Sequence, residues 1–172
     1  IEIRTVVDEF ISSISADCQK SNITFLTPQY NGVLLFTRPM HSSEWSSILF
    51  NFYTNSKKAI YRKGEKGIIG IECGVSEKMI YLEFSDNGIG IPEEYEERIF
   101  DEFFTTTSAM NYEDIDSVNA VLGTGLGLKI VKDIVESYKG RIFVTSPKNQ
   151  FNTCIRVEIP MLDDKDFEKY GL

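Results

Sequence analysis

The sequence is poor in the residues that mark metal-binding, secreted or membrane-spanning proteins. Its cysteines, Cys18, Cys73 and Cys154, lie far apart and lack the spacing of a metal site or a redox pair, which indicates a reducing compartment. No apolar run approaches the roughly 20 residues that cross a bilayer, and no signal peptide opens the chain. We therefore expect a cytoplasmic domain, with any membrane anchor of the full-length protein outside this stretch.

Positive charge is also in deficit. The 172 residues include 18 Lys and Arg against 26 Asp and Glu, for a formal net charge of −8. This excess of acid argues against a nucleic-acid partner and against membrane contact by this domain. A phosphate ligand stays compatible with it, because a local pocket or a metal ion can reverse the field. Because residue 1 is Ile and not Met, we expect a piece of a longer chain.

The length and the 42% hydrophobic content fit one domain with its own core. We expect this domain at residues 1–162 and an acidic C-terminal tail at 163–172. Helical spacing of apolar residues predicts a helix over 3–19 and a second one that is capped by Ser42 or Ser43 and stops at Gly64.

The remaining segments predict paired strands and two more helices. Strands are expected at 22–28, 32–37, 67–75, 79–86, 141–147 and 153–160, a turn at 28–32, a short helix at 91–100 with Pro92 in its first position, and a last helix ending at Gly140. Since the strands come in adjacent pairs, we predict an α+β two-layer sandwich. Its mixed, mostly antiparallel sheet is covered by helices on one face.

Two asparagines on the second helix raise the question of a ligand. Asn51 and Asn55 are four residues apart and share a face with Ile48, Phe52 and Ala59, at the edge of the buried side. Buried amides need hydrogen-bond partners. Either a polar ligand lies beside this helix, or the two asparagines form a structural polar pair, and the helix alone favours neither reading.

The segment DNGIGIP follows the predicted strand that ends at Asp86. Gly88 and Gly90 permit a tight turn and the close approach of a ligand. Asp-Asn-Gly is also a common turn sequence, so this segment alone favours an ordinary Asx turn. The segment RIFDEFFTTT then opens a long loop, and Phe100 within it suits the core. A loop of such length in a compact domain indicates function or mobility.

A glycine-studded turn, GTGLGLKIV, leads into the last helix. Gly123, Gly125 and Gly127 stand where helix-forming residues are expected. They fit a flexible joint, and they equally fit backbone N–H groups that wrap a phosphate at a helix N-terminus.

Taken together, the four segments resemble the GHKL family of ATP-binding domains, and most closely the catalytic domains of sensor histidine kinases. ILFNFYTNSKKAI resembles the N box, DNGIGIP the first glycine box, RIFDEFFTT the F box and GTGLGLKIV the second glycine box. The resemblance covers about residues 1–160. It implies a Bergerat-type ATP-binding fold, ATP and Mg²⁺ as cofactors, and phosphoryl transfer from ATP to a histidine.

The resemblance also implies roles for individual residues. Asn55 matches a Mg²⁺ ligand, and Asn51 and Lys58 match catalytic residues on the phosphate side. Asp86 matches the carboxylate that accepts the adenine amino group, assisted by Thr153. Residues 101–122 resemble a lid over the nucleotide. The implied ATP contacts are Asn51, Asn55, Lys58, Asp86, Gly88, Gly90, Ile91, Phe100, Thr106, Gly123, Thr124, Gly125, Leu126, Gly127, Leu128 and Thr153.

The residue type at position 51 distinguishes kinases from hydrolases in the family that this sequence resembles. Hydrolytic relatives place a glutamate there as a general base for water, a role that asparagine does not fill. The alternatives are an ATP-driven conformational ATPase and an ATP-binding regulatory module without kinase activity. Three positions depart from the family pattern, at Ser56, where alanine is common, at Thr107, where lysine is frequent, and at Asn152, where glycine is usual.

The only histidine is His41, and it lacks the surroundings of a phosphoacceptor. We expect it to be a surface residue near a helix start. The resemblance then implies a phosphoacceptor and dimerisation helical domain, upstream in the full-length protein or in trans. It also implies a response regulator as a downstream partner.

Overall fold

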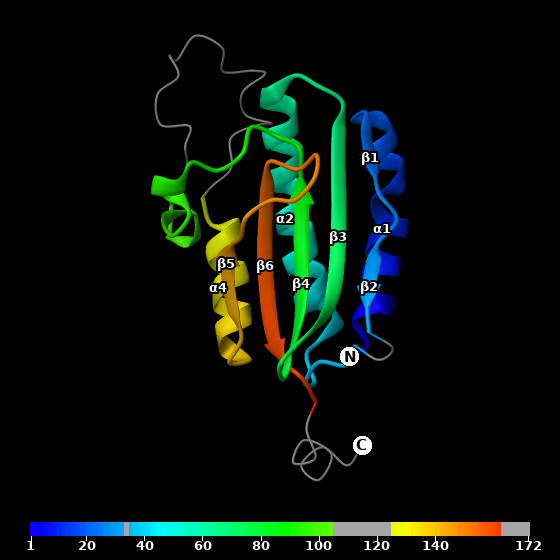
Figure 1. Cartoon of the computed structure of the whole chain (residues 1–172), viewed down its shortest axis with the longest axis vertical. Coiled ribbons are helices and arrows are strands. Elements are labelled where there is room, and N and C mark those ends of the chain that lie inside the picture. Colours follow the sequence, from blue (N-terminus) through cyan, green and yellow to red (C-terminus); the bar gives the residue numbers. More distant parts are fainter. Residues whose placement is uncertain (33–34, 105–124, 163–172) are drawn as a thin grey trace.

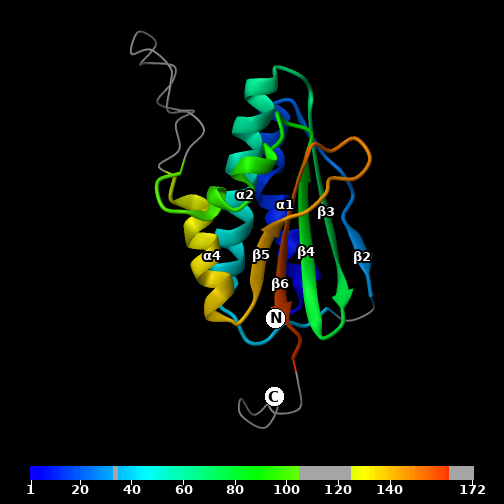
Figure 2. The ribbon, with the colours of Figure 1, turned by 60° about the vertical axis from the view of Figure 1, so that its left-hand side comes forward.

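The computed structural model describes residues 1–32, 35–104 and 125–162. In these residues, three helices lie against one face of a six-stranded sheet (Figures 1 and 2), which confirms the predicted α+β sandwich. The helices are α1 (Ile3–Lys20), α2 (Ser42–Lys63) and α4 (Gly127–Ser137), with two 3-10 turns, η1 (Glu93–Tyr95) and η2 (Arg98–Phe100). The strands are β1 (Ile23–Phe25), β2 (Gln29–Asn31), β3 (Gly67–Ser76), β4 (Met79–Asp86), β5 (Arg141–Val144) and β6 (Thr153–Pro160).

The strand order β1-β3-β4-β6-β5 places the ends of two distant strands side by side. β1 and β2 both run parallel to β3, and the other pairings are antiparallel. Asp86, the last residue of β4, pairs with Ile69 of β3 on one side and with Thr153 of β6 on the other. The register therefore sets the two predicted base-contacting residues next to each other.

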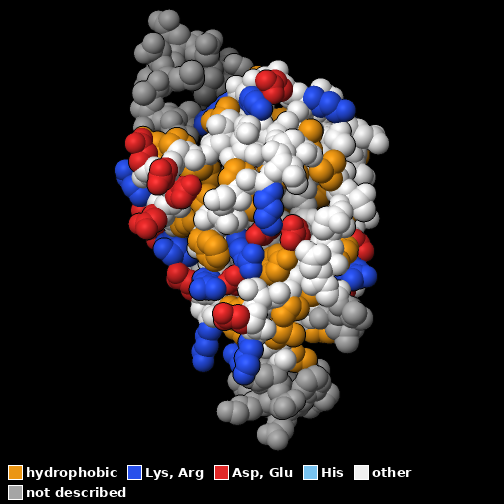
Figure 3. All heavy atoms as spheres, in the orientation of Figure 1, with side chains coloured by type: hydrophobic (Ala, Val, Ile, Leu, Met, Phe, Trp, Pro, Cys, Tyr) orange, Lys and Arg blue, Asp and Glu red, His pale blue; other side chains and the backbone are white. Residues whose placement is uncertain are grey.

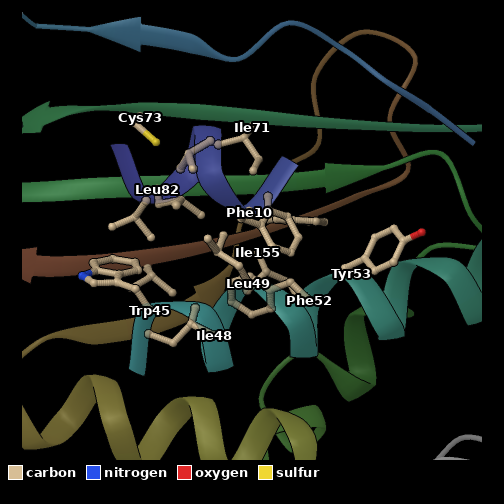
Figure 4. Packing of buried hydrophobic residues seen from close by; sticks show 14 of the residues in the cluster. Phe10, Trp45, Ile48, Leu49, Phe52, Tyr53, Ile71, Cys73, Leu82 and Ile155 are labelled. Atoms are coloured by element: carbon tan, nitrogen blue, oxygen red, sulfur yellow. The ribbon is translucent and has the colours of Figure 1, made fainter. Parts of the chain in front are cut away.

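The core lies between the sheet and the helices, with α2 at its centre (Figure 4). Trp45, Ile48, Leu49 and Phe52 of this helix are at most 1% exposed. They recur at the three- and four-residue spacing that puts one helix face against the sheet. The strands contribute alternate residues, because successive side chains of a strand point to opposite faces. Core residues from β3, β4 and β6 are Ile69, Ile71, Cys73, Ile80, Leu82, Phe84, Ile155, Val157 and Ile159.

The other face of the sheet carries a network of charged side chains (Figure 3). Glu83 and Glu158, both nearly fully buried, share the guanidinium of Arg156 at 2.9 and 2.8 Å. Arg141 also pairs with Glu158, and Lys148 pairs with Glu83 at 3.1 Å. Each buried carboxylate therefore has two cationic partners. Aromatic rings lie beside this network, with Tyr81 under the Arg156 guanidinium.

Several predicted boundaries are wrong in detail. The turn expected at 28–32 contains β2 instead, which pairs with Glu72–Gly74 of β3. The described residues of the segment expected as a strand at 32–37, which are 32 and 35–37, belong to no strand. Phe36 and Thr37 form only isolated bridges. β2 is short and its partner is remote in sequence, so local composition does not reveal it.

Helix ends also differ from the prediction. α2 is capped by His41, whose N–H donates to Glu44 Oε2 at 2.9 Å, and not by Ser42 or Ser43. The helix expected at 91–100 is the pair of turns η1 and η2. Pro92 caps η1 instead of standing at its first position. The last helix ends at Ser137, before Gly140. The predicted tail at 163–172 lies outside the described residues.

Candidate nucleotide-binding site

Two glycines of the predicted boxes lie against α2, one beside Ala59 in its C-terminal half and one beside Asn51 near its middle. A Cβ placed on Gly88 would lie 2.6 Å from the Ala59 Cβ, and one placed on Gly127 would lie 2.5 Å from the Asn51 Oδ1. Both distances are below any normal contact, so neither glycine tolerates a side chain without movement of its neighbour. The loop after β4 and the start of α4 therefore both rest on the helix that carries the predicted N box.

Asp86 is the buried polar centre of this region and is only 3% exposed. Its Oδ2 accepts a hydrogen bond from the Ser56 hydroxyl at 2.6 Å, and its Oδ1 accepts one from the Gly88 N–H at 2.8 Å. The Thr153 side chain is a third donor to the same carboxylate. These donors come from α2, from the loop after β4 and from β6, so the carboxylate is held in one orientation.

Burial and hydrogen bonding act on Asp86 in opposite directions. Removal from water raises the pKa of this carboxyl group, and the donors Ser56, Gly88 and Thr153 oppose the rise. Desolvation is the largest effect, so the pKa lies above its usual value. A buried carboxylate with lone-pair capacity left over is suited to an N–H donor of a ligand, such as the amino group of adenine.

Two asparagines brace the glycine loop that follows Asp86. The Asn152 side-chain amide donates to the Gly88 and Asn87 carbonyls at 2.8 and 3.2 Å, and its backbone N–H donates to the Asp86 carbonyl. Asn87 in turn accepts from the Ile68 N–H and donates to the Lys66 carbonyl. Gly90, two residues after Gly88 in the same loop, has φ +81°, a backbone conformation that favours glycine. The loop is therefore fixed to β3 and to the entrance of β6.

The second glycine segment serves close packing in this structure. Gly125 adopts φ +70°, and a Cβ there would lie 2.7 Å from the Phe103 carbonyl carbon. Gly127 makes room for the amide of Asn51, whose Nδ2 donates to the Ser47 carbonyl at 2.8 Å. These two glycines thus bring the N box, the F box and the start of α4 into contact, a role that phosphate binding alone did not predict.

The residues of α2 that are predicted to face phosphate have polar groups without a partner in the described part of the chain. Within the described residues, the Asn55 amide has no hydrogen-bond partner and Lys58 has no acidic partner, although both side chains are half-buried. Burial lowers the pKa of Lys58, and the nearby charge of Arg62 adds to this effect. An unpaired ammonium and a free amide oxygen on one helix face suit a phosphate and a hard cation.

The remaining predicted residues are distributed around this centre. Phe100 is 4% exposed and belongs to the core, as expected, while Ile91 and Leu128 pack against the core from its margin. Leu126 is the residue before α4. Thr106, Gly123 and Thr124, and the predicted lid except for its first residues, lie outside the described residues.

Sequence reasoning missed the contacts of Ser56, Asn87 and Asn152. Ser56 and Asn152 were noticed only as departures from a family pattern, and Asn87 only as part of a turn. Each supports Asp86 or its loop through a partner that is 19 or more residues away in the sequence. The sequence indicates these contacts only by placing a polar residue within or beside a predicted motif.

The chain is a one-sided α+β sandwich whose polar centre, Asp86, lies between its central helix and a glycine loop. The model of the family described as histidine kinase-, DNA gyrase B-, and HSP90-like ATPase matches residues 41–163, and the chain belongs to this family. Within it, the chain is a catalytic domain of the sensor histidine kinase type.

Curated relatives support this placement. The chain is 35% identical over 130 residues to the sensor protein kinase WalK of Staphylococcus haemolyticus, and 33% identical over 130 residues to that of Staphylococcus aureus strain Newman. These alignments include 72% of this chain and 19% of each relative. The chain therefore spans about a fifth of the length of these kinases.

Solved structures share the fold. The catalytic domain of histidine kinase ThkA aligns with a TM-score of 0.70 at 23% identity, over 93% of this chain and 94% of that one. The mycobacterial sensor histidine kinase MprB aligns with a TM-score of 0.68 at 22% identity, over 93% and 95%. ThkA in complex with the response regulator protein TrrA aligns at 0.64 and 23% identity, over 94% and 41%.

Among the described residues, no helix is both long enough and apolar enough to cross a membrane.

Proposed function

We propose that this domain binds Mg·ATP and transfers the γ-phosphoryl group to a histidine outside this stretch. The observation that carries the proposal is the absence of a general base on α2 beside the proposed phosphate site. The only acid of this helix is Glu44, in its first turn. Its carboxylate accepts from the His41 N–H and from the Tyr138 hydroxyl at 2.6 Å. At the position where a hydrolase needs a base, this helix has the amide of Asn51.

The proposed roles follow from the free polar groups. Asp86 would accept the adenine amino group, and Lys58 would neutralise phosphate charge. Asn55 would be the protein ligand of Mg²⁺, because amide oxygen suits a hard cation that keeps much of its water. Among the described residues there is no cluster of three His, Cys, Asp or Glu side chains that could hold a metal. The cation would therefore depend on the nucleotide phosphates for further ligands. When bound, it would supply charge neutralisation for phosphoryl transfer.

A histidine acceptor is compatible with an amide in place of a base. A neutral imidazole presents a nitrogen lone pair and attacks without prior deprotonation, whereas water needs a base or careful orientation. Asn51 is held by Ser47 and fitted against Gly127, so it can position a group but cannot take up its proton. The domain would act by orientation and electrostatics.

His41 is not proposed as the acceptor. It is exposed and lies at the N-terminus of α2, where its backbone N–H donates to the Glu44 carboxylate. We propose that the acceptor lies on a dimerisation and phosphoacceptor helical domain, upstream in the full-length protein or supplied in trans. A response regulator is the proposed downstream partner, supported by the complex that ThkA forms with TrrA.

The decisive experiment uses this domain together with its native upstream segment and γ-labelled ATP. We expect acid-labile, base-stable protein phosphate on a histidine of the upstream segment, and little release of free phosphate by the domain alone. His41→Gln should leave the labelling unchanged, and Gln in place of the acceptor histidine should abolish it. Rapid hydrolysis by the domain alone, with no phosphohistidine formed, would favour an ATP-driven conformational ATPase.

A further inference from the structure

Ser56 makes an unusual hydrogen bond for a serine inside a helix. Helical serine hydroxyls commonly bond to a carbonyl of the preceding turn, as Ser46 does with the Ser42 carbonyl at 3.0 Å. Ser56 instead donates across the core to Asp86 Oδ2 on β4, at 2.6 Å. Both side chains are buried, at 4% and 3% exposure. The hydroxyl is therefore directed at the carboxylate and away from its own helix.

The lone pairs of the carboxylate limit what this contact can do. An ionised carboxylate has about four acceptor positions. The Gly88 N–H occupies one on Oδ1 and the Ser56 hydroxyl occupies one on Oδ2, and Thr153 acts on the same carboxylate. The carboxylate keeps acceptor capacity for a donor from the base. Each donor also favours the ionised over the protonated form, and Ser56 has the largest effect among the donors that oppose the desolvation of Asp86.

We infer that Ser56 is a positioning residue for base recognition, because its hydroxyl keeps Asp86 ionised and fixes which acceptor position faces the nucleotide. The inference rests on the proposed function, since it takes Asp86 as the contact of the adenine amino group. It assigns a role to position 56, where the family pattern commonly has alanine and this chain has serine.

Other charges around Asp86 do not explain its protonation state. On α2, Lys63 is committed to the Asn87 carbonyl and to Glu65, and Lys58 lies at the phosphate end of the site. On β6, burial raises the pKa of Cys154 to about 11, so this thiol stays neutral. β3 presents Ile69 to Asp86. Hydrogen bonds and desolvation are the causes that act on this carboxyl group, with no charged neighbour among them.

The test compares the wild-type chain with Ser56→Ala by measuring ADP affinity between pH 4 and pH 8 without metal. If Ser56 keeps Asp86 ionised, its removal moves the acid limb of ADP binding upward by about one to two pH units. At the high-pH plateau a smaller affinity loss should remain, because the carboxylate has lost the donor that orients it. Titration of ADP itself cancels, because both proteins meet the same ligand at each pH. Ser56→Thr, which retains the hydroxyl, should return the limb toward the wild-type pH, and Ser46→Ala is the matched control.

A second measurement follows the Asp86 carboxyl carbon directly by NMR in the unliganded proteins. An upward shift of its titration in Ser56→Ala supports the inference even if nucleotide binding fails for another reason. Coincident titrations, or an affinity loss that is equal at every pH, overturn it and leave Ser56 a packing residue. If the wild-type chain binds no ADP at any pH, the proposed function fails, and the carbon titration still decides the effect of Ser56 on Asp86.

Discussion

The base end and the phosphate end of the proposed site differ in how far the protein satisfies its own polar groups. At the base end, Asp86 has donors from three elements, and the loop after it is braced by Asn87 and Asn152. At the phosphate end, Asn55 and Lys58 have no hydrogen-bonding or acidic partner among the described residues. In the proposed site, the fold therefore pre-forms the base end, while the phosphate end keeps polar groups that a ligand would satisfy.

Asp86→Asn should have the largest effect, because it changes the acceptor at the pre-formed end. We expect ADP affinity to fall about 10- to 100-fold, the range for losing a buried hydrogen bond to a charged group. Discrimination between ATP and GTP should shrink as well, since guanine presents a carbonyl where adenine presents its amino group. Calorimetry measures both effects. Asp133→Asn, at an exposed partner of Lys129, is the control, and equal ADP affinity for Asp86→Asn and wild type would refute the adenine assignment.

Asn55→Ala and Lys58→Ala should each weaken Mg·ATP by about tenfold and leave adenosine binding unchanged. Both residues are assigned to phosphates and metal, which adenosine lacks. Lys57→Ala is a close control, because the Lys57 ammonium is paired with Asp17 of α1 at 2.7 Å. If adenosine and Mg·ATP weaken by the same factor, the two residues support the helix and do not contact phosphate.

Gly127→Ala should destabilise the fold by about 1–2 kcal/mol, because its Cβ would meet the Asn51 Oδ1. Asn51 cannot easily turn away, since its amide is bonded to the Ser47 carbonyl. The double variant with Asn51→Ala removes the clash and should recover most of the loss, as a thermal double-mutant cycle would measure. Simple additivity of the two single effects would show that the contact between α2 and α4 is not tight at this point.

The long periodic elements could be predicted from the sequence, and the short ones could not. α1, α2, β3, β4 and β6 follow from apolar spacing and from stop signals such as Gly64. β2 was missed because its three residues are held by pairing with β3, and no pattern within the segment records that pairing. Capping by His41 was missed because neighbouring serines are stronger cap formers.

The candidate site divides in the same way. The motifs predicted that Asn51, Asp86 and the glycines lie together. They did not predict the partners of Ser56 and Asn152, which bond to residues 30 and 64 positions away. The register of β4 against β6 and the packing of α2 on the sheet create these contacts. These contacts form only in the assembled fold, so the local sequence pattern identifies one residue of each pair and not its partner.

The smallest expected effect concerns stability, and it follows from the desolvation of Asp86. Burial raises the pKa of this carboxyl group in the folded chain above its unfolded value. Its contribution to the free energy of unfolding is therefore fully present below the unfolded pKa and is lost as pH rises through the folded pKa, by about 1.4 kcal/mol for each unit between the two. Asp86→Asn carries no such titration. We expect the variant to gain stability relative to the wild type as pH rises from about 4 toward neutrality, and to keep a constant difference above that, measured by urea unfolding without nucleotide.

Asp133→Asn should show no such gain, and a stability difference for Asp86→Asn that does not change with pH would mean that the base end carries no desolvation cost. If the gain is observed, the residue that most improves nucleotide binding is also one that weakens the unliganded fold, as is common where a buried charge serves function.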